Sequence, residues 1–123
     1  MRQIIRLMLA IEAPCFIAAG VIHSGLLVAV DIHHQAALAE SVIGVVLLIG
    51  FALTWLWPDQ ARLIGLIAQA FATLGTLIGV YTIIVGFGPR GAADLVFHIA
   101  ILVVLGWGLV TTTRFRSGRG VRA

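Results

Sequence analysis

The residues of this sequence that could do chemistry are histidines and carboxylates set within long apolar runs. His23, Glu40 and His98 each belong to a different run and are expected at a similar depth. Two imidazoles and a carboxylate are typical of a divalent metal site, and two histidines on opposing helices can ligate the iron of haem b. Asp94 precedes His98 by one helical turn, so its carboxylate is expected to orient that imidazole. Tyr81 is expected in the same layer.

A second polar layer is expected toward the other end of the runs, where Glu12, Gln69 and Thr54 lie at a common depth. Glu12 and His23 are eleven residues apart, about three helical turns, so they share one face of a helix. Two interpretations of Glu12 stay open. It is either a titratable carboxyl of a proton-coupled carrier or a neutral group that is hydrogen-bonded to Gln69.

Both layers require membrane-spanning helices to position them. The chain of 123 residues is 61% hydrophobic and only 11% charged, whereas about a quarter of the residues of a soluble domain are charged. Apolar stretches cover approximately residues 4–30, 37–57, 63–86 and 95–113, and each is close to the ~20 residues that cross a bilayer. The sequence therefore predicts an all-α integral membrane protein. It is expected to form a single domain, a bundle of four transmembrane helices, followed by a basic tail over residues 114–123.

The arginines predict how this bundle is oriented. All eight basic residues are arginines, and four crossings leave only Arg90 on the side opposite to the others. The positive-inside rule then puts both termini in the cytoplasm (N-in/C-in), as a multi-pass protein of the cytoplasmic (inner) membrane. The net charge of +3 is interpreted as a tail that rests on the anionic headgroups of the lipid bilayer, with no nucleic acid as partner. Cys15 stands alone, which excludes a disulfide framework and a cysteine zinc site.

Small residues recur along the third apolar stretch in alternating steps of three and four positions. They are Gly65, Ala68, Ala72, Gly75, Gly79, Thr82 and Gly86. Such a stripe lets helix backbones approach closely, and Gly75 and Gly79 complete a GxxxG motif. The stripe predicts tight packing within the bundle, and it is also compatible with a homodimer or a membrane complex formed through this helix.

The stretch DIHHQAALAE, residues 31–40, connects the first apolar run to the second. Asp31, His33 and His34 fall outside the apolar run, where solvated polar side chains are expected rather than ligands. Glu40 lies a full turn into the run and is the residue of this stretch for which a role is expected. No H-x-x-x-H, H-E-x-x-H or E-x-x-H spacing occurs within a run. A hydrogen-bond network that fixes helix register therefore explains these groups as well as a ligand site does.

Two stretches resemble the DoxX-like group of small four-helix membrane proteins. RLMLAIEAPCFIAAGVIHSG, residues 6–25, is similar to the first span of that group, an Arg-led apolar run that ends in an A-G-x-x-H step. AESVIGVVLLIG, residues 39–50, is similar to its second span. The resemblance implies a four-helix bundle in the cytoplasmic membrane and, for some members, a role in quinone-linked or other redox complexes. His23 and Glu40 match its polar positions.

These features predict a small membrane protein that binds a ligand or cofactor in the outer half of its helix bundle, with His23, Glu40 and His98 around the site. The expected function is that of a redox-linked component that holds a quinone, a haem or a divalent metal. The sequence assigns no enzymatic reaction. Two other functions are compatible: a proton-coupled transporter of small molecules that depends on Glu12 and Gln69, and a non-catalytic assembly subunit recruited through the third helix.

Overall fold

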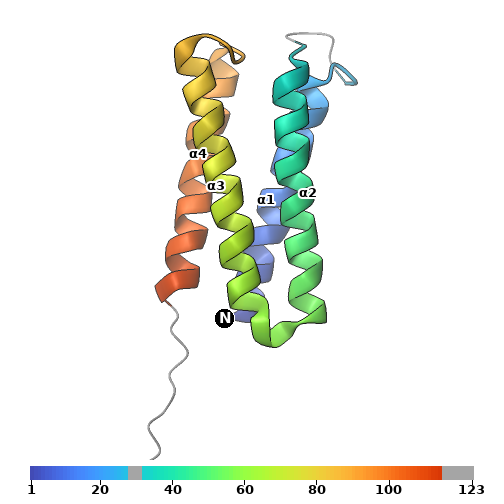
Figure 1. The fold of residues 1–123 in the computed structure, drawn as a ribbon, viewed down its shortest axis with the longest axis vertical. Coiled ribbons are helices and arrows are strands. Elements are labelled where there is room, and N and C mark those ends of the chain that lie inside the picture. The colour runs from blue at the N-terminus through green and yellow to red at the C-terminus, as the bar shows by residue number, and fades with distance from the viewer. Residues whose placement is uncertain (28–31, 115–123) are drawn as a thin grey trace, which may run out of the picture.

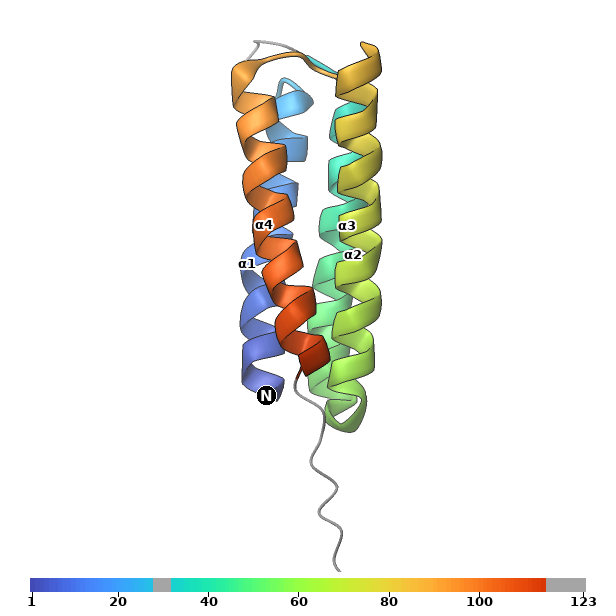
Figure 2. The ribbon, with the colours of Figure 1, turned by 90° about the vertical axis from the view of Figure 1, so that its left-hand side faces the viewer.

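In the part of the chain that the structure describes, residues 1–27 and 32–114, four long helices run alternately up and down (Figure 1). In this computed structural model they are α1 (Arg2–His23), α2 (His34–Leu56), α3 (Ala61–Val85) and α4 (Ala92–Arg114), with a 3-10 helix η1 (Pro58–Gln60) before α3. Figures 1 and 2 place α2 and α4 on opposite sides of the bundle. We call the end with Met1, η1 and Arg114 the N-terminal end. The end with the α1–α2 and α3–α4 connections is the loop end.

Each helix buries one stripe of residues, because steps of three and four positions keep side chains on one helix face. On α4 the buried residues are His98, Ile101, Leu105, Gly108 and Thr112, and on α2 they are Ala37, Glu40, Ile43, Gly44, Leu47, Gly50 and Thr54. This spacing favours helices that pack almost parallel to one another. Leu9, Leu47 and Leu105 come from three different helices and meet in a fully buried aliphatic core.

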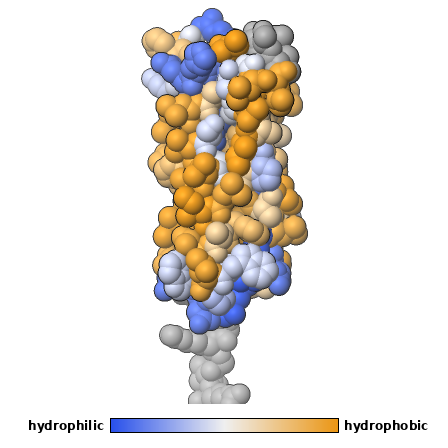
Figure 3. Space-filling view, turned by 90° about the vertical axis from the view of Figure 1, so that its right-hand side faces the viewer, coloured by the Kyte–Doolittle hydropathy of each residue, from blue (hydrophilic) through white to orange (hydrophobic). Residues whose placement is uncertain are grey.

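The outward faces of the helices are apolar along most of their length. Large exposed hydrophobic side chains include Ile49, Leu74, Ile84 and Val103, one or more from each of α2, α3 and α4. Figure 3 shows the result, a broad apolar surface between two polar ends. All four helices are long and apolar enough to cross a membrane, so the helical fold class predicted from the sequence is confirmed.

The helix ends are closed by hydrogen bonds that lipid cannot supply. α3 ends at Gly86, whose φ of +92° is the left-handed conformation that glycine adopts without strain, and its N–H donates to the Thr82 carbonyl. At the N-terminal end, the guanidinium group of Arg62 donates to the carbonyls of Thr112 and Thr113. The contacts of Arg62 join the start of α3 to the end of α4.

The small residues of α3 allow the other helices to approach it closely. A Cβ atom added at Gly65 would lie 2.5 Å from Ile5 of α1, and one added at Gly75 would lie 2.7 Å from Ile43 of α2. Ala72, between them, is fully buried. The stripe therefore serves the packing of a single bundle, while contact between two copies of the chain stays a prediction.

The first helix is shorter than the predicted stretch 4–30. α1 ends at His23, and the chain turns at Ser24 and at Gly25, which has a φ of +78°. The Ser24 hydroxyl donates to the Val21 carbonyl and stabilises this turn. Hydropathy missed the helix end because the apolar run continues beyond the turn, where Leu26 is 79% exposed. His23 consequently lies in the last turn of α1, at the loop end.

Candidate functional site

His23 lies between two carboxylates at the loop end of the bundle. Its Nδ1 atom is 2.7 Å from Oε2 of Glu40 on α2, and its Nε2 atom is 2.7 Å from Oδ1 of Asp94 on α4. His23 is 6% exposed and Glu40 is 4% exposed, so solvent screens these contacts little. We call these three residues the loop-end triad. It joins α1, α2 and α4.

The two short contacts determine how many protons the triad holds. A neutral imidazole has a single N–H and donates one hydrogen bond, whereas a carboxylate only accepts. Both nitrogens of His23 face a carboxylate oxygen. Two hydrogen bonds therefore require one extra proton, on the ring or on a carboxyl group. With that proton the triad carries a net charge of about −1, because two carboxylates outweigh one positive charge.

Asp94 orients His98 through its backbone. The Asp94 carbonyl accepts a hydrogen bond from Nδ1 of His98 at 2.7 Å, while the Asp94 carboxylate faces His23. The other carboxylate oxygen, Oδ2, accepts from the Gly91 N–H at 3.1 Å and caps the start of α4. The prediction that the carboxylate of Asp94 orients His98 is thus corrected. The end of α1 lies beside the first turn of α4, so the carboxylate of Asp94 contacts His23 instead.

One ring nitrogen of His98 is left for other contacts. Because Nδ1 donates to a carbonyl, Nε2 carries the lone pair in the neutral ring. Nε2 lies against Gly79 of α3, where an added Cβ atom would approach it to 2.9 Å. A side chain at position 79 would therefore displace the imidazole. Gly79 of the small-residue stripe makes room for His98.

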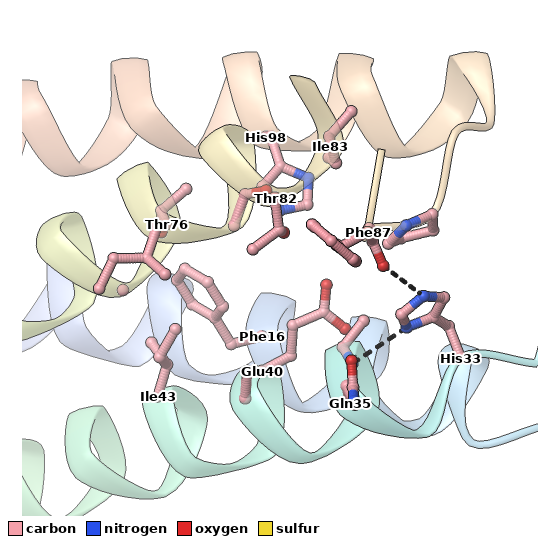
Figure 4. Close-up of a pocket in the computed structure, with 17 residues that line it drawn as sticks. Phe16, His33, Gln35, Glu40, Ile43, Thr76, Thr82, Ile83, Phe87 and His98 are labelled. Atoms are coloured by element: carbon pink, nitrogen blue, oxygen red, sulfur yellow. Dashed lines mark hydrogen bonds between the residues drawn. The ribbon is translucent and has the colours of Figure 1, made fainter. Parts of the chain in front are cut away.

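A cavity of about 150 Å³ lies between α2, α3 and α4 beside the triad. Its apolar lining includes Phe16, Ile43, Ile78, Ile83 and Phe87, and its polar lining includes His33, Glu40, Thr76, Thr82 and His98. Figure 4 shows Glu40 projecting from α2 toward Thr82 and His98. His23 holds Oε2 of Glu40, whereas Oε1 is buried and has no hydrogen-bond partner among the described residues. Glu40 thus lines an apolar cavity and carries a buried carboxylate oxygen that has no partner among the described residues.

His33 was expected to be a solvated loop residue, and the structure gives it a structural role. Its Nδ1 atom accepts from the Ala36 N–H at 3.4 Å at the start of α2, and its Nε2 atom lies 3.1 Å from the Phe87 carbonyl (Figure 4). His33 therefore ties the two connections of the loop end together. Histidine is not a preferred residue at helix N-caps, so the sequence held no signal for this role. His34 is exposed, as expected, and Asp31 lies outside the described residues.

Tyr81 does not join the site. Its side chain is 64% exposed, although the sequence predicted it in one layer with His23, Glu40 and His98. Two positions along an α-helix turn a side chain through about 200°. Tyr81 therefore faces away from the side on which Gly79 packs against His98. Depth alone, without the rotation about the helix axis, predicted the wrong neighbours for this residue.

A second polar cluster joins three helices in the N-terminal half. Nε2 of Gln69 donates to both carboxylate oxygens of Glu12, at 3.0 and 3.3 Å, and the Thr112 hydroxyl lies 3.4 Å from Oε1 of Gln69. Thr54 does not join this cluster, because its hydroxyl donates to a carbonyl of its own helix and Arg6 donates to its carbonyl. Glu12 and Gln69 do not line the cavity beside the triad. The cluster has the geometry of a structural network.

The donor arrangement at the loop end does not fit a metal ion or a haem. Within residues 1–27 and 32–114, no group of three or more His, Cys, Asp or Glu side chains could hold a metal ion. Both nitrogens of His23 already face carboxylates, so this ring is not free to ligate haem iron. Of the cofactor classes that the sequence suggested, a quinone needs no such ligand.

No model of a protein family matches this chain, and no curated protein or solved structure is significantly similar to it. What the chain does must therefore be inferred from the loop-end triad and the cavity beside it.

Proposed function

We propose that this chain is a membrane protein that binds a lipophilic ring compound with hydroxyl groups, of the quinol class, between α2, α3 and α4. The observation that carries the proposal is Glu40, which lines an apolar cavity and whose Oε1 is a buried carboxylate oxygen without a partner among the described residues. An unpaired polar atom in such surroundings costs about 1–3 kcal/mol. A ligand that donates a hydrogen bond to this oxygen removes that cost.

The polar atoms of the cavity favour a ligand that donates hydrogen bonds. Oε1 of Glu40 accepts, and Nε2 of neutral His98 also accepts because Nδ1 uses the ring proton. The two residues lie on opposite sides of the cavity, on α2 and α4. A ring with hydroxyl groups supplies donors to both. The oxidised form of such a ring has carbonyl groups in their place and supplies none.

The size of the cavity supports a ligand with one ring. An apolar protein cavity of roughly 150 Å³ accommodates benzene, and the cavity here has a volume of about 150 Å³. A single six-membered head group fits this space and a porphyrin does not. The resemblance of residues 6–25 and 39–50 to DoxX-like proteins agrees with a redox-linked role. A hydrophobic tail of the ligand would lie among lipids, in which such molecules dissolve.

The proposal includes the orientation of the bundle, with the loop end and its cavity in the outer half of the cytoplasmic membrane. Arg2, Arg6, Arg62 and Arg114 lie at the N-terminal end, and Arg90 lies at the loop end. A reporter that is active only in the cytoplasm should be active when it is fused after Ala123 and inactive when it is inserted at Arg90. A reporter that is active only outside the cytoplasm should show the opposite pattern. Identical signals from the two positions would contradict the orientation and the number of crossings.

The ligand is tested with a matched pair of probes, a short-chain benzoquinol and the corresponding benzoquinone. Isothermal titration calorimetry on the purified protein in detergent should show tighter binding of the quinol by about tenfold, the equivalent of one hydrogen bond. The substitution Glu40→Gln removes the charged acceptor and should weaken quinol binding by about ten- to a hundredfold.

Glu12→Gln is the matched control, because it makes the same change in the other buried cluster. This variant should bind the quinol as the wild type does. Equal affinity for quinol and quinone, or wild-type affinity in Glu40→Gln, would contradict the role given to Oε1. Absence of binding to either probe would reject this ligand class and favour an assembly subunit or a carrier of another molecule.

A further inference from the structure

The loop-end triad lies between two neighbouring cavities, whose linings share His33 and Pro89. Glu40 lines the cavity between α2, α3 and α4, while Asp94 lines a polar cleft at the loop end together with Ile32, His33, Pro89, Arg90 and Gly91. His23 lies between them, 2.7 Å from an oxygen of each. From these contacts we propose that Asp94, His23 and Glu40 form a proton relay between the cleft and the cavity. The relay goes beyond the ligand site, because its geometry is complete without a ligand.

Histidine is suited to this position because its two ring nitrogens can exchange a proton with different partners. The triad holds one extra proton, and this proton can occupy three places. When it is on Asp94, Oδ1–H donates to Nε2 and the ring keeps its own proton on Nδ1. When it moves to Nε2, the ring is an imidazolium between two carboxylates. When the Nδ1–H bond then breaks, the proton binds Oε2 of Glu40 and the ring keeps its proton on Nε2.

One proton thus passes from the cleft side to the cavity side, and the reverse steps return it. No electron moves, and the net charge of the triad is the same in all three states. The proton enters from water at the cleft, where the side chain of Asp94 is 14% exposed, and it reaches Glu40, whose side chain is 6% exposed. A buried carboxyl group without such a connection would exchange protons only through the apolar cavity.

The surroundings of the relay are consistent with transfer along one path. The other ionisable groups that line the two cavities are His98 beside Glu40, Arg90 beside Asp94, and His33, which lines both cavities. His98 Nδ1 donates to the Asp94 carbonyl and His33 Nδ1 accepts from the Ala36 N–H, so neither ring bridges the two carboxylates. The residues of α3 that line the cavity between α2, α3 and α4 include no acid, base or histidine. His23 is therefore the bridging group between Asp94 and Glu40.

The relay is tested without any ligand by infrared spectroscopy of the protein in detergent after transfer from H₂O to D₂O. The carbonyl band of protonated Glu40 is identified by its loss in Glu40→Gln, and the measured quantity is the rate at which this band shifts. His23→Gln keeps a polar side chain that can hydrogen-bond to both carboxylates but cannot pass a proton through a ring. We expect it to slow the exchange of Glu40 by at least about tenfold.

Asp94→Asn is the second variant, which keeps an oxygen that can accept from the Gly91 N–H. It should slow the exchange similarly, which keeps the test informative if His23→Gln does not fold. His34→Gln changes an exposed histidine near the same end and should exchange as the wild type does. Wild-type rates in both triad variants, or absence of a protonated Glu40 band at every pH, would overturn the relay. Failure of quinol binding would leave this result unaffected.

Discussion

Replacing His23 by leucine is expected to lower the free energy of unfolding by about 3–5 kcal/mol, the usual effect of removing one partner from a buried ion pair. The substitution leaves Oε2 of Glu40 and Oδ1 of Asp94 without the nitrogen atoms that now lie 2.7 Å away. Leucine is close to histidine in volume, so the loss should come from the two carboxylates and not from an empty space. Denaturant unfolding in detergent, followed by circular dichroism, measures this difference.

Two further variants distinguish this explanation from a general intolerance of the loop end. His34→Leu changes an exposed histidine of the first turn of α2, and its stability should stay within about 0.5 kcal/mol of the wild type. Adding Glu40→Gln and Asp94→Asn to His23→Leu neutralises both carboxylates and should recover most of the lost stability. If His23→Leu were no less stable than His34→Leu, the triad would not be the contact that holds α1, α2 and α4 together.

For the proposed function, the triad determines which helix can move to admit a ligand. It joins α1, α2 and α4, whereas α3 contributes no side chain to it. Near the triad, α3 contributes Gly79, which packs against His98, and Thr76 and Thr82, whose hydroxyls donate to carbonyls of α3 itself. The wall of the cavity formed by α3 is therefore the one without hydrogen bonds to the triad. A small outward movement of α3 would enlarge the cavity and leave the contacts of the triad, and with them the proposed relay, intact.

The helices and the depth of the polar residues could be predicted from the sequence, because both follow from hydropathy and helical rise. The structure has the four expected helices, each long enough to cross a membrane, although α1 ends before the predicted stretch 4–30 does. It also brings together Glu12 with Gln69 and His23 with Glu40, the residues that the depth estimate placed at common levels.

Rotation about each helix axis and the geometry of the connections could not be predicted in this way. Tyr81 has the right depth and the wrong face, so it is exposed. Asp94 precedes His98 by one turn, but the early end of α1 puts His23 within reach of its carboxylate. His33 caps α2 through a side chain with little preference for that position. These three outcomes depend on how the loop end folds, which the apolar pattern does not specify.

Gly108→Ala is expected to destabilise the bundle by about 2–4 kcal/mol, although alanine is the better helix former by about 1 kcal/mol. Gly108 lies on α4 at the centre of the second polar cluster. An added Cβ atom would collide with Nε2 of Gln69 and would lie 2.9 Å from Oε1 of Glu12. Because Gln69 is the donor to Glu12, moving its amide leaves a buried carboxyl group without a hydrogen bond. The midpoint of thermal unfolding in detergent should fall accordingly.

Gly106 provides the control on the same helix, because a Cβ atom added there meets no atom within 4 Å. Gly106→Ala should keep the stability of the wild type or raise it by up to about 1 kcal/mol, as the helix propensity alone predicts. The two substitutions are chemically identical and two positions apart, so their difference isolates the contacts of the cluster. A similar effect of both variants would mean that Glu12 and Gln69 can rearrange freely. The second polar cluster would then not fix the register of α1, α3 and α4.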